Sequence, residues 1–191
     1  MTDKHQRILQ AASKVFAKRG FYNSRVSDIA KEANVADGTI YLYFKNKDDI
    51  LISLFEDVIR RLVEETTKSM EGIKDPLEKL RHFAITHIDI ITKDHELAEV
   101  IQVELRQSSH FMKDYENKPF RDYLNIIRSI IVDGQEMGVI RKDITPGIFK
   151  RSFFGALDEM ARYWVLSSRK KHDILEAARE ISDMIVRGIR T

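Results

Sequence analysis

The sequence has no cysteine and only three prolines among its 191 residues. Without thiols the chain forms no disulfide, has no thiolate nucleophile or cysteine-ligated zinc, and cannot sense redox state through thiols. It also lacks any run of about 18 apolar residues, and residues 1–5 have no apolar signal-peptide core. We therefore expect a cytoplasmic protein that does not associate with a membrane.

The motifs of the common enzyme classes are also missing. The chain has no His-Glu-x-x-His, no Gly-x-Gly-x-x-Gly, no Walker loop and no Gly-x-Ser-x-Gly. Its six histidines are scattered. His95 and Glu99 have the i,i+4 spacing that could hold a metal, but an exposed ion pair explains this spacing more simply. The sequence therefore predicts no enzyme, no cofactor and no metal site.

Charge is distributed unevenly along the chain. Residues 1–47 contain nine Lys/Arg and four Asp/Glu, a net charge of +5, whereas the remainder has a net charge of −3. A basic end on a mildly acidic body is typical of a protein that binds nucleic acid at one end only. Chance variation in solvated surface charge could give the same numbers. The prediction of nucleic-acid binding therefore depends on the motif within residues 1–47.

The basic end contains two short helical segments joined by a tight turn. Residues 26–35 place small and apolar side chains on one side of a helix. In residues 36–47, Ile40 and Phe44 are four apart and suit the core, while the side chains between them face away. This arrangement predicts a helix-turn-helix, whose second helix reads the major groove of DNA.

Polar and aromatic residues of this region are the candidate DNA contacts. The Tyr41 ring can lie against base edges, the Thr39 and Tyr43 hydroxyls can donate to phosphates, and Lys47 can add a charge-assisted phosphate contact. Gly38 lets the backbone approach closely. Either tyrosine alone would be explained equally well as a structural aromatic. The remaining candidates lie where the two short helices begin: Arg25, Ser27 and Asp37.

This region resembles the TetR family of one-component bacterial repressors. The resemblance covers about Gln6 to Leu54. It rests on Ala11, Ala12, Phe16, Gly20, Phe21, Ile29, Ala30, Ala33, Val35, Gly38, Thr39, Ile40, Tyr41, Tyr43, Phe44, Lys47 and Leu51. Arg25 and Ala36 depart from the pattern, because hydroxyl residues usually cap the two short helices at these positions. Ser24 and Asp37 are then the nearest candidate caps.

The rest of the chain also has helical periodicity. Apolar residues recur at three-to-four spacing, and a polar segment at 108–118 is predicted to be a loop. Helices are predicted over about 3–19, from 48, from 76, over 97–105, from 119, over 148–168 and over 172–190. The expected fold is all-α with about nine helices: a DNA-binding head in residues 1–47, joined by a long helix to a ligand-binding and dimerisation domain in residues 48–191.

The last two predicted helices carry apolar residues on more than one face. A helix on the surface of a monomer needs only one apolar stripe, so the second stripe is either a dimer contact or part of a thicker core. The family resemblance implies that these helices pair with their copies in a homodimer. Such a dimer holds two heads one helical turn apart on palindromic duplex DNA.

The body offers an apolar interior that would accept a long hydrocarbon. Residues 35–55 and 104–108 are similar to the fatty-acid-degradation repressors of Gram-positive bacilli, which release DNA on binding long-chain acyl-coenzyme A. This resemblance implies cations for the coenzyme phosphates, with Arg106 as first choice and Lys113, Arg151 and Arg162 as further candidates. The candidate ligand-binding residues are His87, Ile91, Val103, Arg106, Tyr123, Ile127, Phe153, Arg162 and Trp164.

Two other interpretations stay open. The protein could be a TetR-type repressor of the drug-efflux kind, responding to another hydrophobic ligand. It could also be an all-helical adaptor without DNA binding, although a membrane-surface protein of that class would need a basic amphipathic helix, and the basic residues lie in the head instead.

Overall fold

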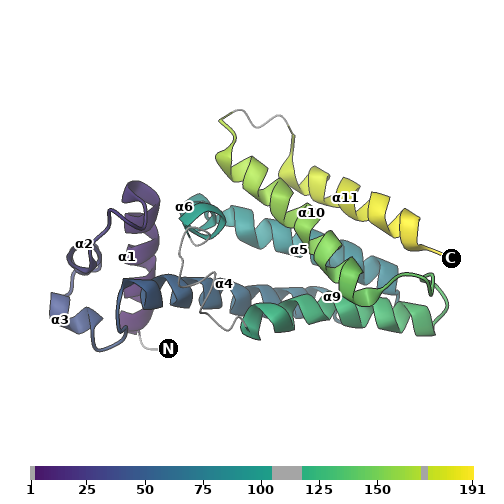
Figure 1. Cartoon of the computed structure of the whole chain (residues 1–191), viewed down its shortest axis with the longest axis horizontal. Helices are drawn as coiled ribbons and strands as arrows, with labels where there is room; N and C mark the ends of the chain where they lie inside the picture. The colour runs from purple at the N-terminus through teal and green to yellow at the C-terminus, as the bar shows by residue number, and fades with distance from the viewer. Residues whose placement is uncertain (1–2, 105–117, 169–171) are drawn as a thin grey trace. The chain divides into compact units, whose positions relative to one another are not determined.

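The computed structural model describes residues 3–104, 118–168 and 172–191. Within these ranges the chain forms nine α-helices, one π-helical turn and no strand (Figure 1). None of these helices is long and apolar enough to cross a membrane. The prediction of an all-α fold is confirmed. Most of the predicted loop at 108–118 lies outside the described residues.

The helices belong to two compact units. The first comprises Met1–Val58 and Asp94–Glu116, and the second comprises Ile59–Lys93 and Asn117–Thr191. Helix α4, Lys47–Ser69, contributes its first part to one unit and its remainder to the other. The sequence-based boundary between a head and a body stays a prediction.

The first unit contains the helix-turn-helix. Besides the start of α4, its elements are α1 (Asp3–Arg19), α2 (Val26–Glu32), α3 (Asp37–Ile40), α6 (His95–Glu99) and the π-helical turn η1 (Val100–Glu104). The inner sides of α1, α2 and α3 share one core, whose buried members include Ile8, Ala12, Phe16, Ile29, Ala30, Ile40 and Phe44. This core holds two very short helices in place, because neither is long enough to be stable alone.

The turns between the head helices use residues that tolerate a positive φ. Gly20 follows α1 with a φ of 77°, and its N–H donates to the Phe16 carbonyl at 2.8 Å. Such an ending favours glycine. Asn34 follows α2 with a φ of 52°, a conformation that asparagine adopts more readily than most residues. The turn that sets α3 against α2 is therefore encoded locally.

The caps of the short helices differ from the predicted candidates Ser24 and Asp37. Arg25 is the N-cap of α2, and its backbone N–H donates to the Asp28 carboxylate at 3.0 Å. Ser24 is buried, and its hydroxyl donates to the Gly20 carbonyl at 2.7 Å. Asp37 lies one position inside α3. The Asp28 carboxylate thus satisfies the backbone N–H of the N-cap residue, while the Asp28 N–H donates to the Arg25 carbonyl at 3.0 Å.

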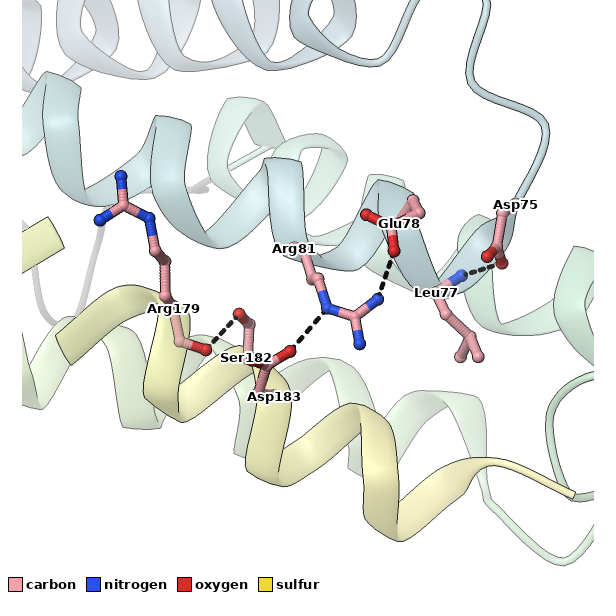
Figure 2. A network of polar contacts seen from close by, with 7 residues as sticks. All are labelled: Asp75, Leu77, Glu78, Arg81, Arg179, Ser182 and Asp183. Carbon is pink, nitrogen blue, oxygen red and sulfur yellow. Dashed lines mark hydrogen bonds and ion pairs between the residues drawn. The ribbon is translucent and has the colours of Figure 1, made fainter. Parts of the chain in front are cut away.

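The second unit is a bundle built on the remainder of α4. Its other helices are α5 (Pro76–Lys93), α9 (Lys118–Glu136), α10 (Pro146–Leu166) and α11 (Ile174–Ile189). Helices α5 and α9 begin within one residue of the predicted starts, and α10 and α11 begin and end within two residues of the predicted positions. Pro76 opens α5, and the Asp75 carboxylate accepts the Leu77 N–H at 2.9 Å (Figure 2). Proline suits this position because its missing N–H would have no partner in the helix.

Arg81 links α5 to α11 (Figure 2). Its Nε donates to Asp183 Oδ1 at 2.7 Å and its Nη1 donates to Glu78 Oε1 at 2.6 Å. The hydrogen bond from Arg81 lowers the pKa of Asp183. Ser182 is buried and turns its hydroxyl back to the Arg179 carbonyl at 2.9 Å. One arginine therefore links side chains of two helices at the surface of the bundle.

The tight connection after α9 requires a glycine at position 134. A Cβ at Gly134 would overlap the Ile140 side chain and would lie 3.2 Å from Pro76 Cβ. The Gly134 carbonyl also accepts the N–H groups of Val139 and Ile140, each at 3.0 Å. The connection after α9 thus folds back tightly onto α9 and onto the start of α5.

Candidate nucleic-acid interface and ligand site

The second helix of the helix-turn-helix lies in residues 36–44, which we call the recognition segment. Its α-helical part is shorter than the sequence pattern predicts. The α-helix α3 ends at Ile40, and Tyr41 to Tyr43 form a turn. The N–H groups of Tyr43 and Phe44 both donate to the Ile40 carbonyl at 3.0 Å, so the chain stays coiled up to Phe44. Ile40 and Phe44 are buried as predicted. They anchor one side of the segment and leave the other side in solvent.

Most of the predicted DNA contacts are exposed on the first unit. The Tyr41 side chain is 59% exposed. Thr39 is half-buried, and Tyr43 is half-buried with its ring 6.1 Å from that of His5. Tyr43 is therefore partly a structural aromatic. The remaining exposed candidates are Arg25, Ser27, Asp37 and Gly38.

Lys47, predicted to contact phosphate, has partners within the head. Its Nζ donates to the carbonyls of Phe21, Ser24 and Tyr22 at 2.6, 2.9 and 3.2 Å. The same ammonium lies 4.5 Å from the centre of the Phe21 ring, within the range of a cation–π contact. An ammonium has three N–H donors, and here each has an acceptor. This geometry favours a role for Lys47 in holding the α1–α2 turn against the start of α4.

Sequence reasoning missed two exposed residues of this face. Leu42 is 80% exposed, which is unusual for a leucine, and Lys45 is exposed just after the turn. The signal was present, because position 42 lies two residues from both Ile40 and Phe44. In a coiled segment, two residues correspond to about half a turn, so Leu42 must point away from the core. An exposed leucine here can contact a thymine methyl group.

The second unit gathers polar and aromatic residues at its centre. His87 on α5 and Tyr123 on α9 are buried, and His87 Nδ1 lies 2.9 Å from the Tyr123 hydroxyl. Phe83 stacks on Tyr123 with ring centres 5.1 Å apart, and it lies 6.1 Å from Phe153 on α10. The structure thus brings together three predicted ligand residues. Phe83 was missed, although it lies one helical turn before His87.

Burial decides the protonation of this pair. It lowers the pKa of His87 to about 4, against a weaker opposing effect of Asp158. Burial also raises the pKa of Tyr123, and the Thr66 side chain acts in the opposite direction. Desolvation disfavours the charged form of each group. Both side chains are therefore neutral at neutral pH.

The other predicted ligand residues are less closely grouped. Ile91 and Ile127 are buried within the second unit. Trp164 is half-buried beside a small hollow between α10 and α11, lined also by Ile174. Val103 belongs to η1 in the first unit. Arg106 lies outside the described residues.

Arg162 has a partner on its own helix. Its Nε and Nη2 donate to the two carboxylate oxygens of Glu159 at 2.8 and 2.6 Å. This fork-to-fork geometry is the one that arginine would otherwise offer to a phosphate. A phosphate that used this same edge of the Arg162 guanidinium would have to displace Glu159.

Comparisons with known proteins cover nearly the whole chain. Residues 8–54 match the family described as "Bacterial regulatory proteins, tetR family", and residues 55–188 match "YsiA-like protein, C-terminal region". The chain is 38% identical over 186 residues to the fatty acid metabolism regulator protein of Bacillus subtilis (strain 168). This match covers 97% of the chain and 95% of that protein.

Two solved structures are similar in fold as well as in sequence. The transcriptional regulator FadR from Bacillus subtilis, crystallised in complex with stearoyl-CoA, matches with a TM-score of 0.89 and 38% identity, covering 96% of this chain and 98% of that one. The fatty acid degradation regulator FadR from Bacillus halodurans matches with a TM-score of 0.91 and 36% identity, covering 98% and 97%. The chain therefore belongs to the TetR family of bacterial regulatory proteins.

Proposed function

We propose that this protein represses genes of fatty acid degradation by binding palindromic duplex DNA as a homodimer, and that long-chain acyl-coenzyme A releases it. The observation that carries the proposal is its 38% identity, over nearly its full length, to a fatty acid metabolism regulator whose structure was solved with stearoyl-CoA. In this reading the protein is a regulator and not an enzyme.

DNA recognition is assigned to the exposed side of the recognition segment. The first 47 residues have a net charge of +5, which attracts the phosphate backbone before any base is read. Tyr41 and Leu42 then offer an aromatic ring and an apolar side chain to base edges. Ser27 and Arg25 at the start of α2 suit contacts that position the protein on the backbone.

Dimerisation is assigned to the outer faces of α10 and α11. Large apolar side chains are exposed there: Ile148 at 67%, Tyr163 at 48%, Leu166 at 54% and Met184 at 60%. Apolar residues concentrated on two adjacent helices favour a symmetric contact with a second copy. A two-fold axis through this face would present two recognition segments to a palindrome.

The effector is assigned to the interior of the second unit. A chain of about 12 to 18 carbons gains roughly 0.8 kcal/mol per buried methylene, which supplies affinity, while the coenzyme head supplies discrimination. Arg151 is exposed on α10 and could contact the phosphates, and Arg106 and Lys113 lie outside the described residues. Release requires that the ligand prefer a conformation in which the two heads no longer match the operator, because equal affinity for both conformations would shift nothing.

The DNA-binding part of the proposal is tested with an operator selected from a random duplex library. Tyr41→Ala should weaken binding to the selected palindrome by about tenfold or more, with little change in thermal unfolding, because the ring is exposed. Fluorescence anisotropy measures the affinity and circular dichroism the unfolding. Wild-type affinity in Tyr41→Ala would contradict the assignment of the reading face.

The effector is tested on a fixed complex of protein and operator. Palmitoyl-coenzyme A should dissociate the complex at concentrations where palmitate and free coenzyme A do not, since the acyl chain and the coenzyme group contribute separately to the affinity. Equal potency of palmitate and its thioester would contradict the role of the head group. Release by a drug-like hydrophobic compound, without any effect of the thioester, would favour a repressor of the drug-efflux kind.

A further inference from the structure

His87 is a buried polar residue of the second unit with one ring nitrogen that its neighbours leave without a hydrogen bond. It is 2% exposed, and Phe83, Tyr123 and Phe154 surround its ring. Its Nδ1 faces the Tyr123 hydroxyl, but within the described part of the chain Nε2 has no hydrogen-bond partner. A buried N–H or lone pair without a partner carries a free-energy cost, so its persistence calls for a reason.

The pair with Tyr123 indicates which nitrogen of His87 carries the proton. Both groups are neutral, so the imidazole has one donor and one acceptor nitrogen and the phenol has one O–H. Within the described residues, Thr66 Oγ1 makes no hydrogen bond, and Nδ1 lies within hydrogen-bond distance of the Tyr123 hydroxyl. A proton on Nδ1 would leave the buried Tyr123 O–H without an acceptor, so the arrangement with fewer unsatisfied groups has Tyr123 donating to Nδ1 and the proton on Nε2.

An Nε2–H in this position suits a neutral acceptor carried by a ligand. A carboxylate or phosphate would be a buried charge beside an uncharged imidazole, which is strongly disfavoured. A hydrocarbon chain brings no acceptor. A thioester carbonyl oxygen is neutral, accepts a hydrogen bond and lies where the acyl chain meets the coenzyme.

Two half-buried rings pack in series beside His87. Phe154 on α10 packs its edge against the His87 ring, with ring centres 5.3 Å apart and planes at 67°. Phe120 on α9 packs against Phe154 in the same way, at 5.0 Å and 73°. A ligand that reached the His87 ring from this side would have to displace these two rings.

We propose that His87 Nε2–H donates a hydrogen bond to the acyl carbonyl oxygen of the bound thioester, and that Tyr123 fixes the tautomer that makes this possible. The proposal rests on the proposed function, in which the effector is a long-chain acyl-coenzyme A. It adds a residue that distinguishes an acyl thioester from other ligands with the same hydrocarbon chain and the same coenzyme group.

The experiment compares palmitoyl-coenzyme A with S-hexadecyl-coenzyme A, a thioether of equal chain length in which a methylene replaces the carbonyl. Dissociation constants are measured on the full chain by calorimetry. The wild type should bind the thioester about tenfold more tightly, because the thioether leaves a buried donor without an acceptor. Equal affinity of the wild type for the two compounds would overturn the proposal.

Two substitutions locate the preference at His87. His87→Leu should bind both compounds with nearly equal affinity, and His87→Gln, which keeps an N–H donor, should retain most of the preference. A tenfold preference that survives in His87→Leu would assign the carbonyl to another residue. His82→Gln, an exposed histidine on the same helix, is the matched control and should behave as the wild type.

A measurement on the wild type keeps the test decisive if His87→Leu fails to fold. With palmitoyl-coenzyme A labelled with ¹³C at the carbonyl, the infrared stretching frequency of the bound ligand should lie below its value in an apolar solvent, because a hydrogen bond weakens the C=O bond. A frequency equal to that in an apolar solvent would refute the proposal. Absence of binding by both compounds would instead refute the proposed function, so the two failures are distinguishable.

Discussion

The geometry of Lys47 makes a specific prediction about salt dependence. A lysine that contacts a phosphate contributes about one unit to the slope of log affinity against log salt. In this structure the ammonium already donates to three backbone carbonyls. We therefore expect Lys47→Ala to leave the slope unchanged, while Lys45→Ala, at an exposed position two residues earlier, lowers it by about one unit.

The magnitude of the structural effect follows from the same contacts. Two of the carbonyls, those of Phe21 and Ser24, are in partly buried contacts with the ammonium, and the contact to Tyr22 is exposed. Hydrogen bonds to charged groups contribute about 1.5–3 kcal/mol each in favourable cases, and solvent screening reduces this. Lys47→Ala should thus lower the free energy of unfolding by about 2 kcal/mol.

Anisotropy titrations with the selected operator between about 50 and 200 mM salt give the slope, and urea unfolding gives the stability. A weakened affinity with the wild-type slope would agree with a lysine that positions the α1–α2 turn. A slope lower by one unit together with wild-type stability would mean that Lys47 leaves its carbonyls for a phosphate, and the reasoning would be refuted.

Two further predictions concern the second unit. The pKa of His87 is about 4 in the folded chain, against an ordinary value of 6.5, so the unfolded chain takes up a proton first as pH falls. Urea unfolding should show that the wild type loses about 2.5 kcal/mol more than His87→Gln between about pH 7 and 4.5, with His82→Gln unchanged from the wild type. Gly134→Ala should lower the free energy of unfolding by about 1–3 kcal/mol, since its Cβ would overlap Ile140. Gly147→Ala, with open space around the new Cβ, should not.

The helical fold could be predicted because its signals are local. Apolar spacing, Pro76 at the start of α5 and Gly20 at the end of α1 each act within a turn or two of the chain. The end of α3 could not be predicted in this way. Residues after Ile40 continue the helical pattern in sequence, yet the α-helix stops there although Ile40 and Phe44 are both buried in the head.

From the sequence, the candidate site could be proposed as a set of residues but not as a set of contacts. The sequence pattern identifies Lys47 as a cation beside a helix start, but its partners are carbonyls more than 20 positions earlier. The pairing of His87 with Tyr123 also joins residues far apart in sequence. Such pairs depend on how helices pack, and composition or periodicity along one helix carries no information about them.

The brevity of α3 has a consequence for altering operator preference. A helix of four residues owes its form to Ile40 and Phe44, whose side chains are enclosed, and owes nothing to its exposed neighbours. Positions 38, 41 and 42 can therefore be randomised together in a library without loss of the fold. Variants selected against new palindromes from such a library should retain the wild-type melting temperature. In the head of this regulator, buried residues therefore maintain the fold, and exposed positions can be changed to alter DNA sequence preference.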